Sequence, residues 1–400
     1  MHNPDFTTKT STRNSDIECL RAFAVISVVF HHSQGVLFVP GLPILQRIFS
    51  VGQFWWGVDL FFAISGFVIA RSLLPELASV AEDRRMRWRV VISFWIRRAW
   101  RLLPSAWLWL ALVLLASAFV NRSGVFMSFH TNLMATLAGM FDVANLRFAQ
   151  AFMRYAYGAS FVYWTLSLEE QFYLLLPLLA LCTRRYLPLV LIAVLAIQLP
   201  MHRNMYLMAF RTDALCLGVL LAVLTKHPVY AAIRPRMLAR LPGLGTFVLV
   251  LVMAIMSLLA MLNGTHSEYA IGGLAIAAIV LVWIASYDAD YLIPQGWFKR
   301  VLVWIGNRSY AIYLCHVPIY FLLRELCFRF GTPGTPLQPS HWLMAAMAGG
   351  LIAGTAALNF RYVEQPLRRY GRRIAERFVA RQIPANELAA GEIQTAASHS

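Results

Sequence analysis

Two side chains suited to acid–base and anion-binding chemistry share one predicted helix near the start of the chain. Residues 16–34, DIECLRAFAVISVVFHHSQ, are typical of an apolar helix, with Arg21 near its start and His32 near its end. A step of eleven residues is about three helical turns, so both side chains lie on nearly one face, roughly 16 Å apart. The pair fits a single polar path through a bilayer. A lone arginine at a helix start is also typical of a topology anchor that reaches the membrane surface, and the rest of the chain has to distinguish the two.

Other ionisable residues lie inside apolar segments, where a charge is costly. A charged side chain at the centre of a membrane helix costs about 2.5–3.5 kcal/mol, so such groups have to be paired, protonated or solvated. The set contains four acids and one arginine, and we expect histidines, water or bound protons to compensate. These side chains and His32 are all predicted at one depth, near the outer side, which favours a functional site over ion pairs that only hold helices together. The residues are Asp59, Glu169, Glu170, Arg211, Asp213 and His316.

An arginine cluster marks the opposite membrane surface. The segment FWIRRAWRLLP places Arg97, Arg98 and Arg101 where the third predicted span leaves the cytoplasm. Arg97 and Arg101 are four residues apart and so share a helix face, and Arg21 is expected at the same depth. Forked guanidinium groups suit phosphates, although a basic cluster here is also a topology signal. Together with the outer ionisable residues, the cluster predicts a phosphorylated donor held from inside and chemistry at a polar core open to the outside.

Composition places these residues in a polytopic membrane protein. The chain of 400 residues is 59% hydrophobic and 14% charged, whereas soluble domains carry about a quarter charged residues. A weaker apolar stretch, 127–145, either crosses the membrane or lies on its surface. Because a spanning helix needs about 20 mostly apolar residues, we predict an all-α transmembrane bundle of ten spans, near residues 17–38, 54–74, 102–120, 163–182, 186–201, 206–225, 244–262, 269–287, 303–324 and 341–360.

Positive charge determines the predicted orientation. With both termini in the cytoplasm and 127–145 not crossing, most of the 35 lysines and arginines face the cytoplasm, as the positive-inside rule requires. A crossing at 127–145 would place the basic tail outside. The net charge of +16 then reflects topology and attraction to anionic lipid, and we expect no nucleic-acid partner. The five cysteines have no paired spacing, so neither a disulfide framework nor a metal site is predicted.

The predicted domain organisation has two parts. Residues 1–370 form the transmembrane domain, and residues 371–400 form a basic cytoplasmic tail that ends in a disordered segment over 382–400. The stretch 361–381 is predicted as a basic helix at the inner membrane surface. We expect a multi-pass protein of the cell inner (plasma) membrane, in contact with membrane lipid.

Seven stretches, in order along the chain, resemble the acyltransferase type 3 family of integral membrane acyltransferases. The stretches are LRAFAVISVVFHH (20–32), GVDLFFAISGFVI (57–69), FWIRRAWRLLPSAW (94–107), YWTLSLEEQFYLLLPLL (163–179), RTDALCLGVLLA (211–222), IGNRSYAIYLCHVPI (305–319) and FRYVEQPLRR (360–369). The resemblance implies an enzyme that moves acyl groups, usually acetyl, from cytoplasmic acyl-CoA (acetyl-CoA) to hydroxyls of sugars or other acceptors, commonly in surface polysaccharides. Some members carry a hydrolase-like domain after the membrane part, and none is expected in this chain.

The resemblance also implies which residues act. The family's motif positions fall on Arg21 and His32 in the first helix, Arg97, Arg98 and Arg101 in the third span, Asp59, Glu169 or Glu170, the pair Arg211 and Asp213, and His316. We expect the arginines of the first and third spans to hold the phosphates of coenzyme A. The arginine–aspartate pair and the late histidine are expected to organise the core or the acceptor.

His32 is the expected general base, which takes the proton from an acceptor hydroxyl as it attacks the thioester carbonyl. One of the carboxylates, Asp59, Glu169 or Glu170, is expected to orient it. Ser65 lacks the flanking pattern of a hydrolase nucleophile, and with Gly66 it is expected to permit close helix packing.

Two alternatives stay open at this level. A carrier or flippase for a glycolipid or an anion, with no acyl-transfer chemistry, would also need buried charges and basic loops. An acyltransferase whose acceptor is a lipid or a small metabolite would carry the same motifs. The main hypothesis is acyl transfer to a glycan. Its acceptor is a cell-surface polysaccharide or a lipid-linked glycan, and proteins of polysaccharide biosynthesis are candidate partners.

Overall fold

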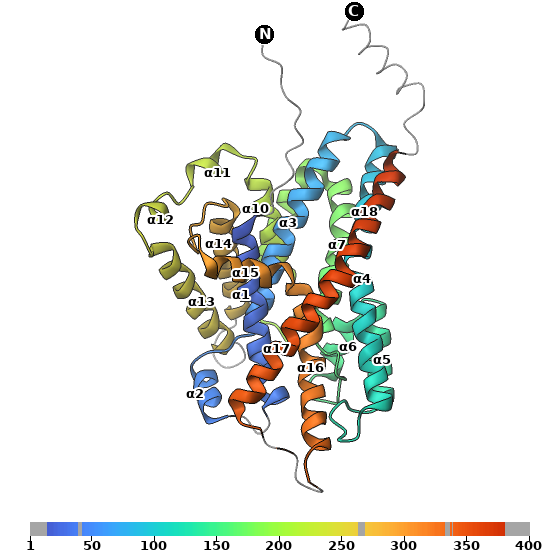
Figure 1. Cartoon of the computed structure of the whole chain (residues 1–400). Helices are drawn as coiled ribbons and strands as arrows, with labels where there is room; N and C mark the ends of the chain where they lie inside the picture. Colours follow the sequence, from blue (N-terminus) through green and yellow to red (C-terminus); the bar gives the residue numbers. More distant parts are fainter. Residues whose placement is uncertain (1–13, 39–41, 263–268, 333–336, 338, 381–400) are drawn as a thin grey trace, which may run out of the picture.

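The regular elements of the structure are helices arranged as one bundle (Figure 1). The computed structural model describes residues 14–380 except 39–41, 263–268, 333–336 and 338. The longer helices are α1 (Ser15–His32), α3 (Gly57–Ser79), α4 (Arg84–Phe119), α7 (Tyr163–Thr183), α8 (Leu187–Gln198), α10 (Asp213–Leu224), α13 (Leu244–Leu262), α14 (Ala270–Ser286), α16 (Ser309–Arg329), α17 (His341–Asn359) and α18 (Gln365–Ala380). The shorter ones are α2 (Pro43–Val51), α5 (Phe129–Met140), α6 (Ala144–Ala151), α9 (Met205–Met208), α11 (Pro228–Ala232), α12 (Met237–Arg240) and α15 (Trp297–Asn307).

The helices have the length and composition of a membrane bundle. In the described residues, eight helical stretches are long and apolar enough to cross a membrane, and α14 is a shorter apolar helix. The predicted spans lie on helical segments, although 206–225 runs over α9 and α10 and 303–324 runs over α15 and α16, so the all-α transmembrane class is confirmed. One of the eight stretches joins α7 and α8, and α8 alone has 12 residues, about 18 Å of helix against a hydrocarbon core of about 30 Å. The count of ten spans and the cytoplasmic location of both termini stay predictions.

The ambiguous stretch 127–145 contains two short helices. α5 has 12 residues and α6 has 8, and a turn between them places Asp142 at φ 55°. Asn132 on α5 is a fully buried polar residue. Its hydrogen bonds make this burial tolerable, since its Oδ1 accepts from the backbone N–H of Ala159 (2.9 Å) and its Nδ2 donates to the carbonyl of Ser128 (3.1 Å). α5 packs against α4, and whether this stretch crosses the membrane stays a prediction.

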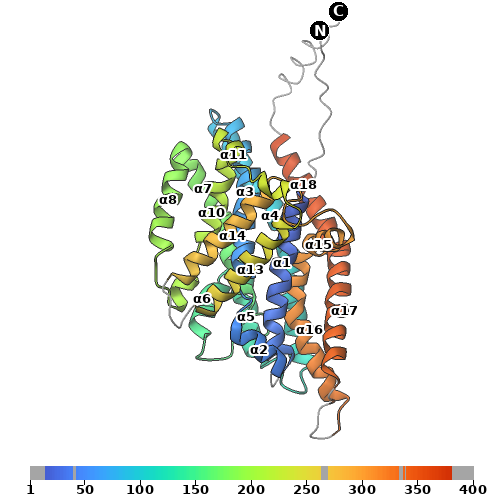
Figure 2. The same cartoon turned by 90° about the vertical axis from the view of Figure 1, so that its left-hand side faces the viewer.

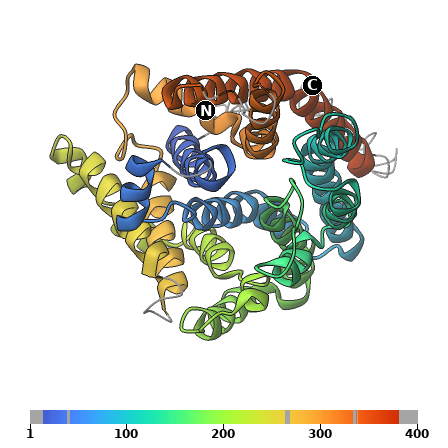
Figure 3. The same cartoon turned by 90° about the horizontal axis from the view of Figure 1, so that it is seen from below.

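Helix α3 lies at the centre of the bundle, between α1 and α10, as the view from below shows (Figure 3). Its contact with α10 is close because glycines face backbone on both sides. A Cβ built on Gly66 would overlap the carbonyl oxygen of Leu215, and one on Gly218 would overlap that of Ala63. The predicted packing role of Gly66 is therefore confirmed, and small residues at such a crossing let two membrane helices approach.

The start of α1 is fixed by a cap and by α15. Asn14 caps the helix, since its Oδ1 accepts from the backbone N–H of Ile17 (2.9 Å). Gly306 on α15 packs against the backbone of Glu18, and Lys299 on α15 forms ion pairs with Asp16 and Asp290. Although burial opposes the charge, these hydrogen bonds raise the pKa of Lys299 above its ordinary value. The first turns of α1, which carry Arg21, are therefore held from two sides.

The C-terminal helix packs on the bundle, and its location at the inner membrane surface stays a prediction. α17 continues through Phe360–Glu364 into α18 without a break, and α18 packs along α4 (Figures 1 and 2). Gly371 allows this, because a Cβ there would overlap the side chain of Trp100, whose ring also meets Tyr370 edge-on at 4.9 Å. The predicted boundary between residues 370 and 371 falls inside α18, and the predicted disordered segment 382–400 lies outside the described residues.

Replacing Gly66 with valine is expected to push α3 away from α10, since the new side chain has to displace the backbone of Leu215. Overpacking of this kind costs about 1–3 kcal/mol, so the unfolding midpoint of the detergent-purified protein should fall by several degrees. Gly354→Val in α17 is the matched control, because a Cβ there meets nothing within 4 Å. Equal midpoints for the two variants would contradict the close crossing.

Candidate active site

Two cavities adjoin inside the bundle, and their linings differ in chemistry. The polar residues of the first, which we call the arginine cavity, include Arg21, Arg98 and Glu169. The second, the histidine cavity, is lined by aromatic side chains together with His31 and His32. Val58 on α3 and Tyr313 on α16 line both cavities, so these two side chains form the boundary between them.

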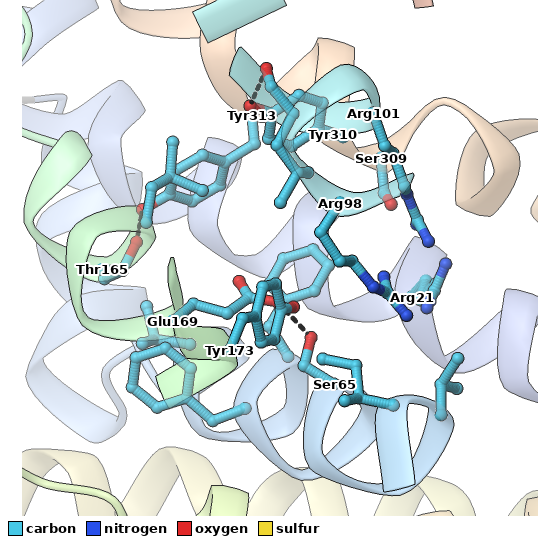
Figure 4. Close-up of a pocket in the computed structure, with 17 residues that line it drawn as sticks. Arg21, Ser65, Arg98, Arg101, Thr165, Glu169, Tyr173, Ser309, Tyr310 and Tyr313 are labelled. Carbon is cyan, nitrogen blue, oxygen red and sulfur yellow. Dashed lines mark hydrogen bonds between the residues drawn. The ribbon is translucent and has the colours of Figure 1, made fainter. Parts of the chain in front are cut away.

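The arginine cavity brings cations from two helices next to one carboxylate (Figure 4). Arg21 comes from α1, and Arg98 and Arg101 come from α4. The guanidinium of Arg98 lies over the ring of Tyr173 at 5.4 Å, a favourable cation–π distance. Glu169 on α7 accepts hydrogen bonds from Ser65 and Tyr173. The cavity therefore has a cationic end suited to an anion and a hydrogen-bonded carboxylate in its wall.

Ser65 acquires a role that its sequence context did not suggest. Its hydroxyl donates to Glu169, which places α3 and α7 in direct polar contact. Glu169 was expected at the outer depth with the other acids, but it lines the arginine cavity instead. Its carboxylate is held there by its bonds to Ser65 on α3 and to Tyr173 one turn further along α7.

The histidine cavity contains a pair of hydrogen-bonded imidazoles. Nδ1 of His32 lies 2.9 Å from Nε2 of His316, and the two rings are stacked at 5.2 Å between centroids. Nδ1 of His316 lies 2.7 Å from the carbonyl oxygen of Tyr313. A carbonyl only accepts, so Nδ1 of His316 carries a proton and its Nε2 accepts from Nδ1–H of His32. This assignment leaves the Nε2 lone pair of His32 outside the chain of hydrogen bonds, as a base requires.

His31 is a cavity residue that the sequence reasoning passed over. Its side chain lines the histidine cavity next to His32, and its Nδ1 is buried without a hydrogen-bond partner among the described residues. Its position off the face shared by Arg21 and His32 gave no reason to single it out. The adjacent HH dipeptide was the signal available in the sequence.

None of the three carboxylates expected to orient His32 is bonded to it in the structure. Nδ1 of His32 is bonded to His316, whereas each of the three candidate carboxylates bonds elsewhere. Asp59 pairs with Arg211, Glu169 bonds Ser65 and Tyr173, and Glu170 is hydrogen-bonded to Asp142. α1 packs against both α3 and α16, and the side chain that bonds His32 is His316 of α16.

The buried arginine–aspartate pairing also differs from the expected one. Arg211 pairs with Asp59 on α3 (Nη1–Oδ1 3.1 Å), and Asp213 pairs with Arg203 (2.8 Å). All four side chains are at most 1% exposed. Arg203 lies in the loop between α8 and α9, and the sequence carries no signal that it folds back onto Asp213. It compensates one of the acids for which histidines, water or bound protons were expected.

Glu170 belongs to the junction of α7 with the turn between α5 and α6. Its carboxyl is hydrogen-bonded to that of Asp142, which requires a proton between them, and burial raises the pKa of Asp142. Beside it, Asn145 donates to Oε1 of Gln171 (3.0 Å) and to the carbonyl of Ala209 (2.8 Å). Asn145 also lines the histidine cavity, so this polar junction forms part of its wall.

Arg97 lies apart from the other arginines of its cluster. It forms an ion pair with Glu76 at 2.7 Å and does not line the arginine cavity. Three of the four arginines expected to bind phosphate, Arg21, Arg98 and Arg101, therefore share that cavity.

Comparison with known proteins gives a consistent assignment over most of the chain. The profile of the acyltransferase domain family, acyltransferase type 3, matches residues 14–360. The chain is 28% identical over 390 residues to the peptidoglycan O-acetyltransferase OatA of Listeria monocytogenes serovar 1/2a, which covers 89% of this chain and 56% of that protein. It is 26% identical over 398 residues to a Bacillus subtilis (strain 168) protein provisionally named peptidoglycan O-acetyltransferase YrhL, covering 91% of this chain and 56% of that one. The chain spans about half the length of these curated relatives, and no solved structure matches it significantly.

The pairing of Arg211 can be tested by a double-mutant comparison. Breaking one partner of a buried pair costs about 3–5 kcal/mol, so Arg211→Gln should lower the unfolding midpoint strongly. Adding Asp59→Asn should cost little more, because the carboxylate left without its cation is then removed. Adding Asp213→Asn should instead add its own full cost, since its partner is Arg203. Thermal unfolding of the wild type, the three single variants and the two double variants distinguishes the pairings, and additivity of Arg211→Gln with Asp59→Asn would refute the observed one.

Proposed function

The chain belongs to the acyltransferase type 3 family, and from this premise we propose that it is a membrane-bound O-acyltransferase. It transfers an acyl group, acetyl by default, from cytoplasmic acyl-CoA to a hydroxyl of a cell-surface polysaccharide or lipid-linked glycan. The printed names of its relatives, O-acetyltransferases of peptidoglycan, support acetyl as the group and a glycan as the acceptor. The proposed location is the cell inner membrane.

One observation carries this proposal: a cationic cavity and a cavity with a hydrogen-bonded imidazole pair share two wall residues. A donor with phosphates and a thioester needs cations at one end and a reactive group at the other. An acceptor hydroxyl needs a base at the place where the thioester arrives. The shared wall of Val58 and Tyr313 supports such a meeting point between the two cavities.

The donor is proposed to occupy the arginine cavity. Arg98 and Arg101 hold its phosphates from the cytoplasmic side, with Arg21 adding charge from α1. The pantetheine arm then extends between α3 and α16 toward Tyr313. The hydroxyl of Tyr313 is held by Thr165 at 2.6 Å and by the carbonyl of Val162 at 3.0 Å, so the boundary side chain is fixed in position.

The chemistry is proposed to occur at His32. Its Nε2 takes the proton from the acceptor hydroxyl as the oxygen adds to the thioester carbonyl carbon. The carbon–sulfur bond then breaks, and the proton on His32 returns to the leaving thiolate. His316 acts as a positioning residue, because its hydrogen bond keeps the proton of His32 on Nδ1. Asp59 holds Arg211 in the wall beside Trp55 and Trp164 and has no contact with the imidazoles in this arrangement.

Replacing His32 with alanine is expected to abolish acetyl transfer, since loss of a general base typically costs 10²–10⁴-fold in rate. Membranes with the verified, inserted protein are given labelled acetyl-CoA and the host's glycan, and label released by mild base is counted. His130→Ala is the matched control, because that histidine is exposed on α5. Full activity of His32→Ala would overturn the assignment. A wild-type protein that neither consumes acetyl-CoA nor labels any acceptor would favour the carrier or flippase class.

Changing His316 distinguishes positioning from folding. His316→Gln can still accept a hydrogen bond from Nδ1–H of His32, whereas His316→Phe cannot. We expect kcat to fall roughly tenfold or more for phenylalanine and less for glutamine, with the KM for acetyl-CoA unchanged in both. A rise in KM with kcat unchanged would place His316 in donor binding instead.

A further inference from the structure

A third cavity opens between α4 and α18 and is lined mainly by arginine. No acidic side chain is among the described residues that line it. Besides Ser72, Phe94 and Gln365, the lining consists of Arg97, Arg98 and Arg101 from α4 and Arg368, Arg369 and Arg372 from α18. We call this cavity the arginine cleft.

The two walls of the arginine cleft are held together independently of any ligand. α18 packs along α4 through Gly371, whose missing side chain makes room for Trp100. The aromatic contact between Trp100 and Tyr370 adds to this interface. The spacing of the opposing guanidinium groups is therefore set by apolar packing, and the cleft is formed in advance.

The six arginines of the arginine cleft favour the binding of an anion. Glu76 pairs with Arg97, and Glu376 pairs with Arg372, each at 2.7 Å. Arg368 also has an interaction partner. The lining still contains Arg98, Arg101 and Arg369, so the cleft stays positively charged. Arginine forks match the oxygens of phosphate groups and bind them in pairs. A ligand with several phosphates would relieve the mutual repulsion and use the geometry of both walls.

The arginine cleft is continuous with the site already described. Arg98 and Arg101 line both the cleft and the arginine cavity. A smaller cavity adjoins them, with Arg21, Arg101 and Arg368 together with Glu364 in its lining. Arg101 thus lines all three spaces, which places the cleft next to the arginine cavity.

We propose that α18 forms the second wall of a nucleotide site, in which the arginine cleft holds the phosphates of the donor's 3′-phosphorylated adenosine diphosphate end. This inference rests on the proposed function, because the donor is taken to be an acyl-coenzyme A. It extends the site beyond residue 360, where the match to the family profile ends. The acyl arm then runs from the cleft through the arginine cavity, and α18 contributes to donor affinity without contacting the thioester.

The test compares two double variants of the full chain in phosphatidylcholine nanodiscs. Arg369→Gln with Arg372→Gln removes two charges from the cleft, and Arg373→Gln with Arg377→Gln removes two from the same helix outside it. All four side chains are exposed, so packing is preserved in both. Binding of adenosine 3′,5′-bisphosphate is measured, together with the preference for acetyl-CoA over S-acetylpantetheine, which has no nucleotide. A second set of nanodiscs contains phosphatidylglycerol.

We expect the cleft variant to bind the bisphosphate roughly tenfold or more weakly and to lose the preference for acetyl-CoA, while the control keeps both. Equal losses in the two variants would overturn the proposal, since any positive charge on α18 would then suffice. Unchanged nucleotide binding, with a response to phosphatidylglycerol lost only in the cleft variant, would overturn it in favour of a lipid headgroup site.

The same data separate the cleft from the proposed function. If the wild type transfers acetyl groups and the cleft variant matches it in both readouts, the function stands and the nucleotide site fails. If the wild type binds the bisphosphate through the cleft but transfers no acetyl group, the nucleotide site stands and the acyltransferase proposal fails.

Discussion

The structure depends on keeping charge stable inside an apolar bundle. Arg211 with Asp59 and Arg203 with Asp213 are almost fully buried, and each ion is tolerable only because its partner lies within hydrogen-bond distance. The first pair ties α3 to the segment just before α10, and the second ties the start of α10 to the loop between α8 and α9. Around Arg211, the rings of Trp55, Phe62 and Trp164 lie at cation–π distance, so the same cation also orders the aromatic wall next to the histidine cavity.

A second consequence of the apolar surroundings is the separation of cations from imidazoles. Helix α1 carries Arg21 into the arginine cavity and His32 into the histidine cavity, about three turns further on. A protonated histidine close to the arginines would add to their repulsion. His32 is instead hydrogen-bonded to His316, whose other nitrogen bonds a carbonyl, and this chain fixes which nitrogen of each ring faces the other group. The proposed division of labour between phosphate binding and proton transfer follows from that separation.

Close packing of helices at glycines determines where the remaining charged side chains lie. Glycines at the crossing of α3 with α10, and Gly371 against Trp100, bring helices together without side chains between them. The first crossing holds the centre of the bundle, next to Ser65 and its bond to Glu169. The second holds α18 against α4 and so forms the arginine cleft. At both crossings, glycine has no side chain between the helices, and the resulting close approach determines where a functional group lies.

The sequence by itself determined the helical membrane class, the helical stretches and the residue types, because hydropathy and the cost of a buried charge act locally along the chain. It singled out Arg21, His32, Asp59, Arg211, Asp213 and His316 for the same reason. Only the tertiary structure decided their partners. Asp59 meets Arg211, Asp213 meets Arg203, and His32 meets His316, because pairing depends on which helices pack and how each is turned about its axis. The arginine cleft likewise arises from two segments more than 250 residues apart, a distance that no local pattern in the sequence encodes.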